Sequence, residues 1–136
     1  MKKASEIYKS DNWGWYDYQP MLNEFGTILV QEDEDNYQGD SFLLYLKTGK
    51  YGFLSFGWGS CSGCDALQAC ANIDEVQELM DQLHNSIIWF DSLDKAKEWL
   101  NDKENQELKW YWSSKEFQTF VDKVLALELR AIWRDG

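Results

Sequence analysis

The sequence predicts an α+β domain in which a small antiparallel sheet, a three-stranded meander, packs with about three helices and is braced by a structural metal site. Three observations predict this fold. Strand-like segments fill residues 26–58, helical periodicity dominates residues 74–131, and all three cysteines and the single histidine fall between Cys61 and His84. The chain has 136 residues, of which 44% are hydrophobic and 16% are aromatic. That is enough for one densely packed domain spanning residues 1–136.

The predicted strands follow an irregular N-terminal region. Residues 1–25 are rich in aromatic side chains, and we expect them to cover the core without regular structure. Residues 26–32 read as a short β-branched strand, and residues 41–47 and 51–58 are rich in Phe, Leu and Tyr. Residues 47–50, with the sequence Lys-Thr-Gly-Lys, are typical of a hairpin turn. We therefore expect the three strands to pair in an antiparallel meander.

Helical spacing of apolar residues characterises the rest of the chain. A first helix is expected over residues 74–87 with Asp74 as its N-cap, and a second, capped by a serine, over residues 92–100. The longest helix opens on a capping-box sequence and extends over residues 113–131. Between the last two helices, residues 108–112 can form a short strand.

The cysteines and the histidine form the most specific pattern in the chain. Cys61 and Cys64 stand in a Cys-x-x-Cys turn, Cys70 follows after five residues, and His84 follows after another thirteen. Three thiolates and one imidazole make a complete tetrahedral set for zinc, and four protein ligands make the site structural and not catalytic. The thirteen-residue gap between Cys70 and His84 lies within the range of about twelve to fifteen found between the Cys and His halves of zinc sites. We expect Asp65 to be the substitute ligand if one of the four is absent.

Two other interpretations of the cysteines stay open. The thiols can be small buried side chains and the histidine a solvated one. Alternatively, Cys61 and Cys64 can perform thiol redox chemistry, because a strand followed by Cys-x-x-Cys resembles the order in thioredoxin-like proteins. Such proteins also need a βαβ frame and a downstream cis-proline, whereas the only proline here is Pro20. An odd number of cysteines also favours metal or free thiols over disulfides.

The net charge of −11 is concentrated in one part of the chain. Residues 10–94 hold fifteen acids and two lysines and carry −13, whereas residues 95–136 hold eight acids and eight bases. Such a field repels nucleic acid and accelerates encounter with a positively charged protein. Solubility alone is the simpler explanation, but the asymmetry favours an acidic interaction face.

Two acidic segments are the candidate partner-binding surfaces. The first is the exposed side of the predicted helix over residues 74–87, and the second is the loop after the first strand. Their acidic residues are Asp74, Glu75, Glu78 and Asp81 in the helix and Glu32, Asp33, Glu34 and Asp35 in the loop.

Several function classes lack their sequence signals. There is no phosphate-binding glycine loop, no dinucleotide fingerprint and no Ser-His-Asp arrangement, so we expect a protein that is not an enzyme. No apolar run approaches the roughly 18 residues of a membrane span. No hydrophobic stretch follows the first residues as in a secretory signal, so the expected compartment is the cytoplasm, where thiols stay reduced.

A small, acidic, aromatic domain with one compact three-cysteine cluster resembles phage-encoded anti-CRISPR proteins. Cys61, Cys64, Cys70 and the acids around them are similar to the zinc-containing streptococcal phage type that inhibits a type II CRISPR effector nuclease. The resemblance implies a small α/β domain with structural zinc, acting as an inhibitor inside the bacterial host cell. It implies a protein partner and no direct nucleic-acid binding. Such nucleases hold the guide–target heteroduplex in a positively charged channel, where carboxylates can occupy the place of phosphates and block DNA loading or activity. An adaptor or immunity protein with another partner is the alternative.

Overall fold

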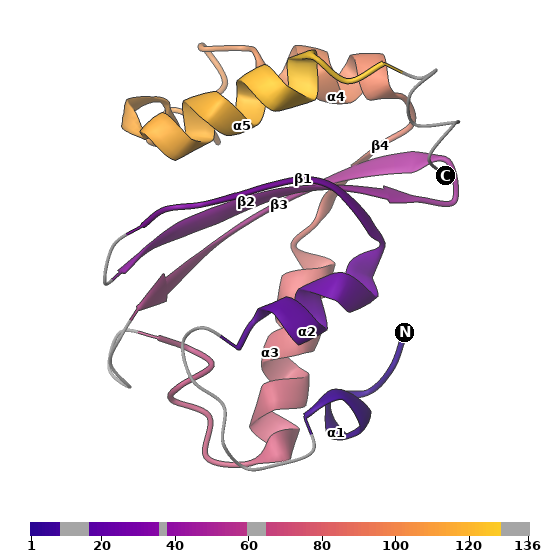
Figure 1. The fold of residues 1–136 in the computed structure, drawn as a ribbon, viewed down its shortest axis with the longest axis vertical. Coiled ribbons are helices and arrows are strands. Elements are labelled where there is room, and N and C mark those ends of the chain that lie inside the picture. Colours follow the sequence, from indigo (N-terminus) through magenta and orange to yellow (C-terminus); the bar gives the residue numbers. More distant parts are fainter. Residues whose placement is uncertain (9–16, 36–37, 60–64, 129–136) are drawn as a thin grey trace.

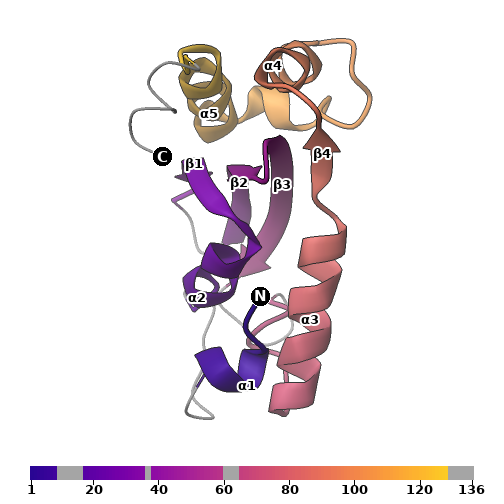
Figure 2. The same cartoon turned by 90° about the vertical axis from the view of Figure 1, so that its right-hand side faces the viewer.

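The computed structural model describes residues 1–8, 17–35, 38–59 and 65–128, which form three layers (Figure 1). The middle layer is a four-stranded antiparallel sheet in the order β1-β2-β3-β4. Helices α1 to α3 cover one face of the sheet, and α4 and α5 cover the other (Figure 2). The strands are β1 Thr27–Asp33, β2 Gln38–Lys47, β3 Lys50–Gly59 and β4 Ile88–Phe90. The α-helices are α1 Ala4–Ile7, α2 Gln19–Leu22, α3 Ile73–Asn85, α4 Leu93–Leu100 and α5 Lys115–Leu125, and short 3₁₀ turns span Asn23–Phe25 and Tyr111–Ser113.

The hairpin between β2 and β3 confirms the predicted turn. Lys47 pairs with Lys50, and the two residues between them have positive φ, 48° at Thr48 and 80° at Gly49. Two consecutive positive φ values are the signature of a type I′ turn, whose twist matches that of the flanking strands. Glycine takes this conformation without steric cost. The turn therefore fixes the register of the two longest strands.

Strand β2 contributes to two separate cores because successive side chains point to opposite faces of a sheet. Leu43 and Tyr45 pack with α1 to α3, whereas Phe42 and Leu44 pack with α4 and α5. All four are fully buried. Such a continuous apolar run is what a strand covered on both faces requires.

The helix starts are set by side-chain caps. Asn72 accepts a hydrogen bond from the backbone N–H of Glu75, Ser92 from that of Lys95, and Ser114 from that of Phe117. The Ser92 cap confirms the predicted start of α4. The cap of α5 lies one residue after the predicted start at residue 113, and α5 ends at Leu125, before the predicted end at residue 131. The N-cap of α3 is Asn72, not Asp74, so the cap of that helix lies two residues earlier than predicted.

The predicted fold class is wrong in three respects. The sheet has four strands and not three, because α3 ends at Asn85 and Ile88–Phe90 pairs with β3 as β4. The described residues hold five α-helices instead of about three, since α1 and α2 lie in the region expected to be irregular. The third error, the metal brace, concerns the cysteine window described below. Separately, residues 108–112, predicted as a short strand, form turns and the start of a 3₁₀ segment. Among the described residues, no helix is both long and apolar enough to cross a membrane.

Candidate functional site

The cysteine window lies between β3 and α3. Cys61 and Cys64 lie outside the described residues, whereas Cys70 follows a turn at residues 66–69 and donates its thiol hydrogen to the carbonyl of Ala66 at 3.3 Å. In the part of the chain that the structure describes, no group of three or more His, Cys, Asp or Glu side chains could hold a metal ion. The predicted metal brace is therefore wrong for the described part of the fold. Zinc binding by the three cysteines themselves stays a prediction.

His84 lies at the C-terminal end of α3. At about 1.5 Å of rise per residue it stands about 17 Å along the helix from Ile73. The imidazole packs on the ring of Phe25, with 5.3 Å between centroids. Burial lowers the pKa of His84, and the charge of Lys47 lowers it further. His84 is thus part of the packing near the end of α3. Its role as the fourth zinc ligand stays a prediction, because Cys61 and Cys64 lie outside the described residues.

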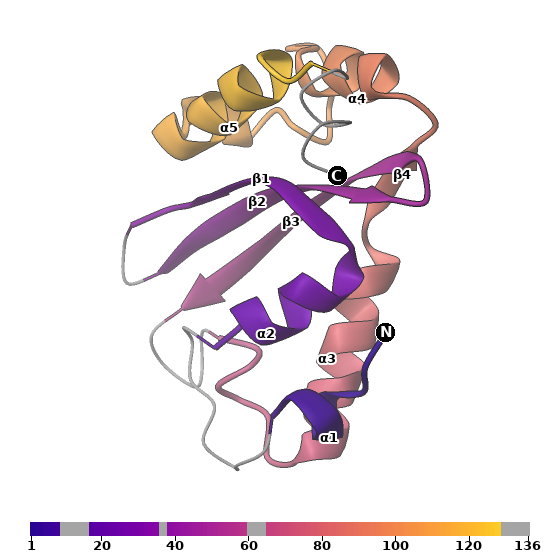
Figure 3. The same ribbon diagram turned by 45° about the vertical axis from the view of Figure 1, so that its right-hand side comes forward.

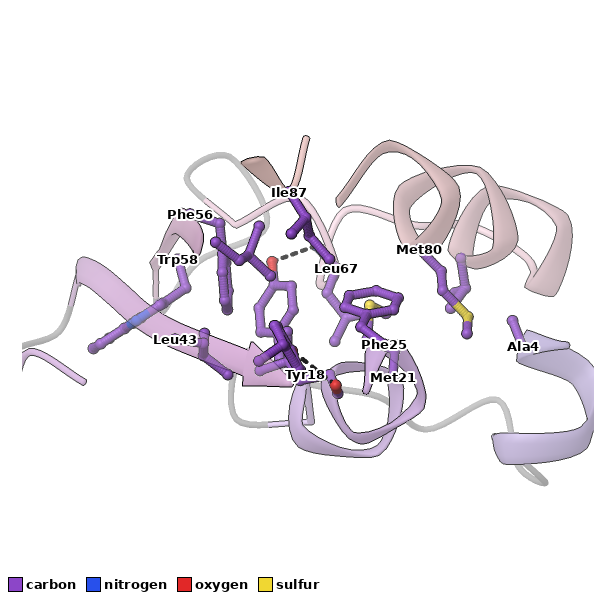
Figure 4. Packing of buried hydrophobic residues seen from close by; sticks show 14 residues of the cluster. Ala4, Tyr18, Met21, Phe25, Leu43, Phe56, Trp58, Leu67, Met80 and Ile87 are labelled. Atoms are coloured by element: carbon purple, nitrogen blue, oxygen red, sulfur yellow. Dashed lines mark hydrogen bonds between the residues drawn. The ribbon is translucent and has the colours of Figure 1, made fainter. Parts of the chain in front are cut away.

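Asp65, the proposed substitute ligand, is a buried structural acceptor with 2% of its surface exposed. Its Oδ1 accepts hydrogen bonds from the Tyr18 hydroxyl at 2.9 Å and the Gly59 N–H at 3.1 Å, and its Oδ2 accepts one from the Gln68 N–H at 2.8 Å. The Tyr18 oxygen in turn accepts from the Leu67 N–H at 3.1 Å, a bond drawn in Figure 4. Both carboxylate oxygens therefore bind the chain itself and join α2 to the end of β3.

The surroundings of Cys70 do not activate its thiol. Burial raises its pKa, and the carboxylates of Glu75, Asp65 and Glu78 raise it further. A thiol that stays protonated is a poor nucleophile. The sheet also differs from the βαβ frame of thioredoxin-like proteins. Helix α3 connects β3 to β4, and these two strands are antiparallel. The sheet thus does not favour the redox interpretation, whose two cysteines, Cys61 and Cys64, lie outside the described residues.

The acidic side of α3 is exposed as the sequence predicts. Asp74, Glu75, Glu78 and Asp81 are all exposed, while Val76 and Met80 face the core. Two of the acids also have structural contacts. Glu75 accepts a hydrogen bond from the Ala71 N–H at 2.7 Å, and Asp81 accepts one from the Gln77 amide at 2.9 Å. We call these four acids the α3 ridge.

The acidic loop after β1 is not one surface, because the strand continues to Asp33 and alternates its side chains between faces. Glu32 pairs with Lys123 of α5. Asp33 lies opposite Ser41 on the other face and accepts from the Gln31 amide at 3.2 Å and 3.3 Å. The predicted docking segment is therefore divided between the two helix layers.

The last two acids of that segment also differ from each other. Glu34 accepts from the Asp40 N–H at 2.7 Å and from the Ser114 hydroxyl at 3.0 Å, which ties β1 to β2 and α5. Asp35 is exposed. Glu34 also affects its neighbour: burial raises the pKa of the Asp40 carboxyl, and the Glu34 carboxylate adds to that rise.

Figure 3 shows α2 beside the sheet. A pocket that the sequence did not predict is lined by residues of α2 and of this end of the sheet. Its volume is about 240 Å³. Three kinds of side chain line it: aromatic rings, three carboxylates and uncharged residues. The aromatic and acidic members are Tyr18, Phe56, Trp58, Asp33, Glu34 and Asp35. In the structure Asp33 pairs with Ser41, which pairs with Phe56. The sequence did not predict this row, because Asp33 was assigned to a loop and not to β1.

Comparisons with protein-family models, with curated proteins and with solved structures find no match to this chain. A function must therefore be argued from the charges and surfaces described above.

Proposed function

We propose that this chain is a non-enzymatic binding protein that presents an acidic layer to a basic, nucleic-acid-handling protein. The resemblance of its cysteine cluster makes a type II CRISPR effector nuclease the first partner to test. In this proposal the protein acts in the cytoplasm of a bacterial host cell and blocks DNA loading or activity without binding nucleic acid itself.

The observation that carries the proposal is the separation of charge between the two helix layers. Helix α3 carries four acids and no lysine or arginine. Helices α4 and α5, on the opposite face of the sheet, each carry two acids and two lysines and are neutral. The charge asymmetry of the sequence thus becomes an asymmetry between two faces of one rigid domain.

Exposed charges of this kind act mainly on the rate of encounter. A single solvated ion pair contributes at most about 1 kcal/mol, but several carboxylates on one face attract a basic surface before contact and raise the association rate. The attraction falls off over a Debye length of about 8 Å at physiological salt. Binding to the nuclease should therefore weaken steeply as salt rises.

The test compares association rates of the purified full chain with a purified type II CRISPR effector nuclease in its apo, guide-loaded and target-loaded forms. The variant Asp74→Lys/Glu78→Lys reverses two charges of the α3 ridge without removing the contact that Glu75 makes. Its matched control, Asp94→Lys/Glu98→Lys, makes the same change at the same spacing on exposed positions of α4. Circular dichroism verifies that both variants fold.

We expect the ridge variant to associate about tenfold more slowly at low salt, within the range over which electrostatic steering acts, and the α4 variant to associate almost normally. The difference in association rate between the two variants should shrink to about twofold or less at 0.5 M salt, because the Debye length is then only about 4 Å. Equal slowing in both variants would show that net charge and not the ridge matters. No binding to any form of the nuclease at low salt would overturn the choice of partner.

A further inference from the structure

The pocket beside α2 is built by a row of paired residues across three strands. Asp33 of β1 pairs with Ser41 of β2, which pairs with Phe56 of β3, so the three side chains lie on one face of the sheet. Tyr18 covers this row from α2, and its ring lies 4.9 Å from that of Phe56. Figure 4 shows the two rings together, with Trp58 beyond them toward the end of the strand.

The aromatic walls are held in place by hydrogen bonds to the chain. The Trp58 indole N–H donates to the Ser41 hydroxyl at 2.9 Å, and the Tyr18 hydroxyl bonds to Asp65 and Leu67. Burial raises the pKa of Tyr18, so this ring stays neutral. The polar atoms of both rings are thus hydrogen-bonded to other groups of the chain.

Two of the three carboxylates around the pocket are available to a ligand. The two carboxylate oxygens of Glu34 accept hydrogen bonds from the Asp40 N–H and the Ser114 hydroxyl. Asp33 and Asp35 are exposed. Within the described residues, the Asp33 carboxylate accepts hydrogen bonds from one exposed amide, that of Gln31. The rim therefore offers two carboxylates next to aromatic rings.

Among the residues that the structure describes, no lysine or arginine lines this pocket. The nearest bases on the strands, Lys47 and Lys50, stand at the hairpin at the opposite end of β2 and β3. Six residues of strand separate Ser41 from Lys47, or about 20 Å at 3.4 Å per residue. That distance exceeds the Debye length of about 8 Å, so these lysines do not neutralise the pocket.

We propose that this pocket receives the guanidinium group of an arginine side chain from the basic partner, stacked on the aromatic wall and paired with Asp33 and Asp35. The inference rests on the proposed function and names the contact by which the acidic layer recognises its partner. A planar guanidinium stacks on aromatic rings and offers a fork of donors to carboxylates. The ammonium of lysine is a compact, strongly hydrated charge and fits such a site less well. A cavity of about 240 Å³ far exceeds the roughly 10–15 Å³ that one water needs.

The test uses N-acetyl-L-arginine methylamide as the probe, titrated into the ¹⁵N-labelled full chain and followed by amide chemical shifts. The citrulline analogue has almost the same shape but no charge, and the lysine analogue has the charge without the planar fork. The variant Asp33→Asn/Asp35→Asn removes both rim charges. Its matched control, Asp74→Asn/Glu78→Gln, removes two charges from the α3 ridge.

We expect saturable shifts at residues 31–35 and 56–59 with the arginine probe. Binding should weaken about tenfold with the citrulline analogue and in the Asp33→Asn/Asp35→Asn variant, and less with the lysine analogue and the ridge variant. Equal shifts with citrulline, unsaturable shifts spread over α3, or unchanged binding in the rim variant would each overturn the inference.

The same variants separate this inference from the proposed function. Saturation of the pocket by the probe, with no binding of the nuclease, supports the arginine site and overturns the choice of partner. Normal binding of the nuclease to the rim variant, with no saturation by the probe, overturns the arginine site and leaves the proposed function standing.

Discussion

Replacing Asp65 tests whether the buried carboxylate, and not a metal ion, holds the end of β3 to α2. Asp65→Ala removes the acceptor of three hydrogen bonds, those from the Tyr18 hydroxyl, the Gly59 N–H and the Gln68 N–H. Two of these bonds are buried and the third is partly buried. Asp65→Asn keeps one oxygen but places an amide group opposite one of the donors.

The expected cost follows from these three bonds. A buried donor that loses its partner costs about 1–3 kcal/mol, and bonds to a charged acceptor lie at the upper end. Water can replace the acceptor at the partly buried Gln68 N–H, so the two buried donors dominate. We expect Asp65→Ala to lower the free energy of unfolding by about 3–5 kcal/mol and Asp65→Asn to lower it by about 1–2 kcal/mol. A typical domain has only about 5–15 kcal/mol in total.

Urea unfolding followed by circular dichroism measures the effect. With an m-value of about 2 kcal/mol/M, a loss of about 4 kcal/mol moves the midpoint down by about 2 M. Tyr18→Phe removes the hydroxyl that joins Asp65 to the Leu67 N–H, and it should cost about 1–3 kcal/mol. Asp35→Ala, an exposed carboxylate on the same side of the sheet, is the matched control and should stay within about 0.5 kcal/mol of wild type.

Each curve is repeated with a chelator. If Asp65 acts through hydrogen bonds alone, its variants differ from wild type by the same amount in both conditions. The reasoning is refuted if Asp65→Ala costs less than about 1 kcal/mol, the lower limit for even one orphaned buried donor. It is also refuted if the chelator lowers the stability of wild type to that of the variant, because Asp65 would then act through a metal.

Two further predictions concern Asp40 and His84. Because burial and Glu34 raise the pKa of Asp40, the folded state holds that proton more tightly than the unfolded state, and stability falls as pH rises above the ordinary aspartate pKa of about 3.9. Asp40→Asn should therefore raise the urea midpoint at pH 7 and leave it nearly unchanged at pH 3; an equal gain at both values would contradict the linkage. If Cys61, Cys64, Cys70 and His84 bind zinc, metal analysis of the desalted protein should find that Cys61→Ser and His84→Ala each lower the zinc content. Unchanged zinc in His84→Ala would remove His84 as the fourth ligand, and a zinc-free wild type would remove the zinc prediction.

Sequence patterns predicted the elements whose signals are local. The hairpin at Thr48 and Gly49 follows from turn chemistry, and the starts of α4 and α5 follow from serine caps. Strand β4 was missed because Ile87 continues the helical spacing of α3. In the structure the helix stops at Asn85, and Ile87 packs into the core from the segment that leads to Ile88–Phe90. A three-residue strand exists only because the edge of β3 is there to pair with it.

The site was less predictable than the fold because it depends on register. The exposed acids of α3 followed from helical periodicity, which a single element determines. The four acids at residues 32–35 were expected to act together. Because β1 extends one residue further than predicted, to Asp33, Glu32 faces α5 and Asp33 lies on the opposite face of the sheet. The aromatic pocket needs Tyr18 and Phe56, distant in sequence, to meet across the sheet. No periodicity within either segment encodes that meeting.

The division of the core between two faces of one sheet has a consequence for synthesis on the ribosome. Phe42, Leu44 and Phe53 belong to the face that α4 and α5 cover, and α5 ends only at Leu125. At about 5–20 residues per second, the ribosome needs about 4–14 s to extend the chain from the middle of β3 to the end of α5. During that interval a complete β2–β3 hairpin presents aromatic side chains that have no cover. Apolar surface that is exposed in this way makes a nascent chain prone to aggregation until the last third of the chain has emerged.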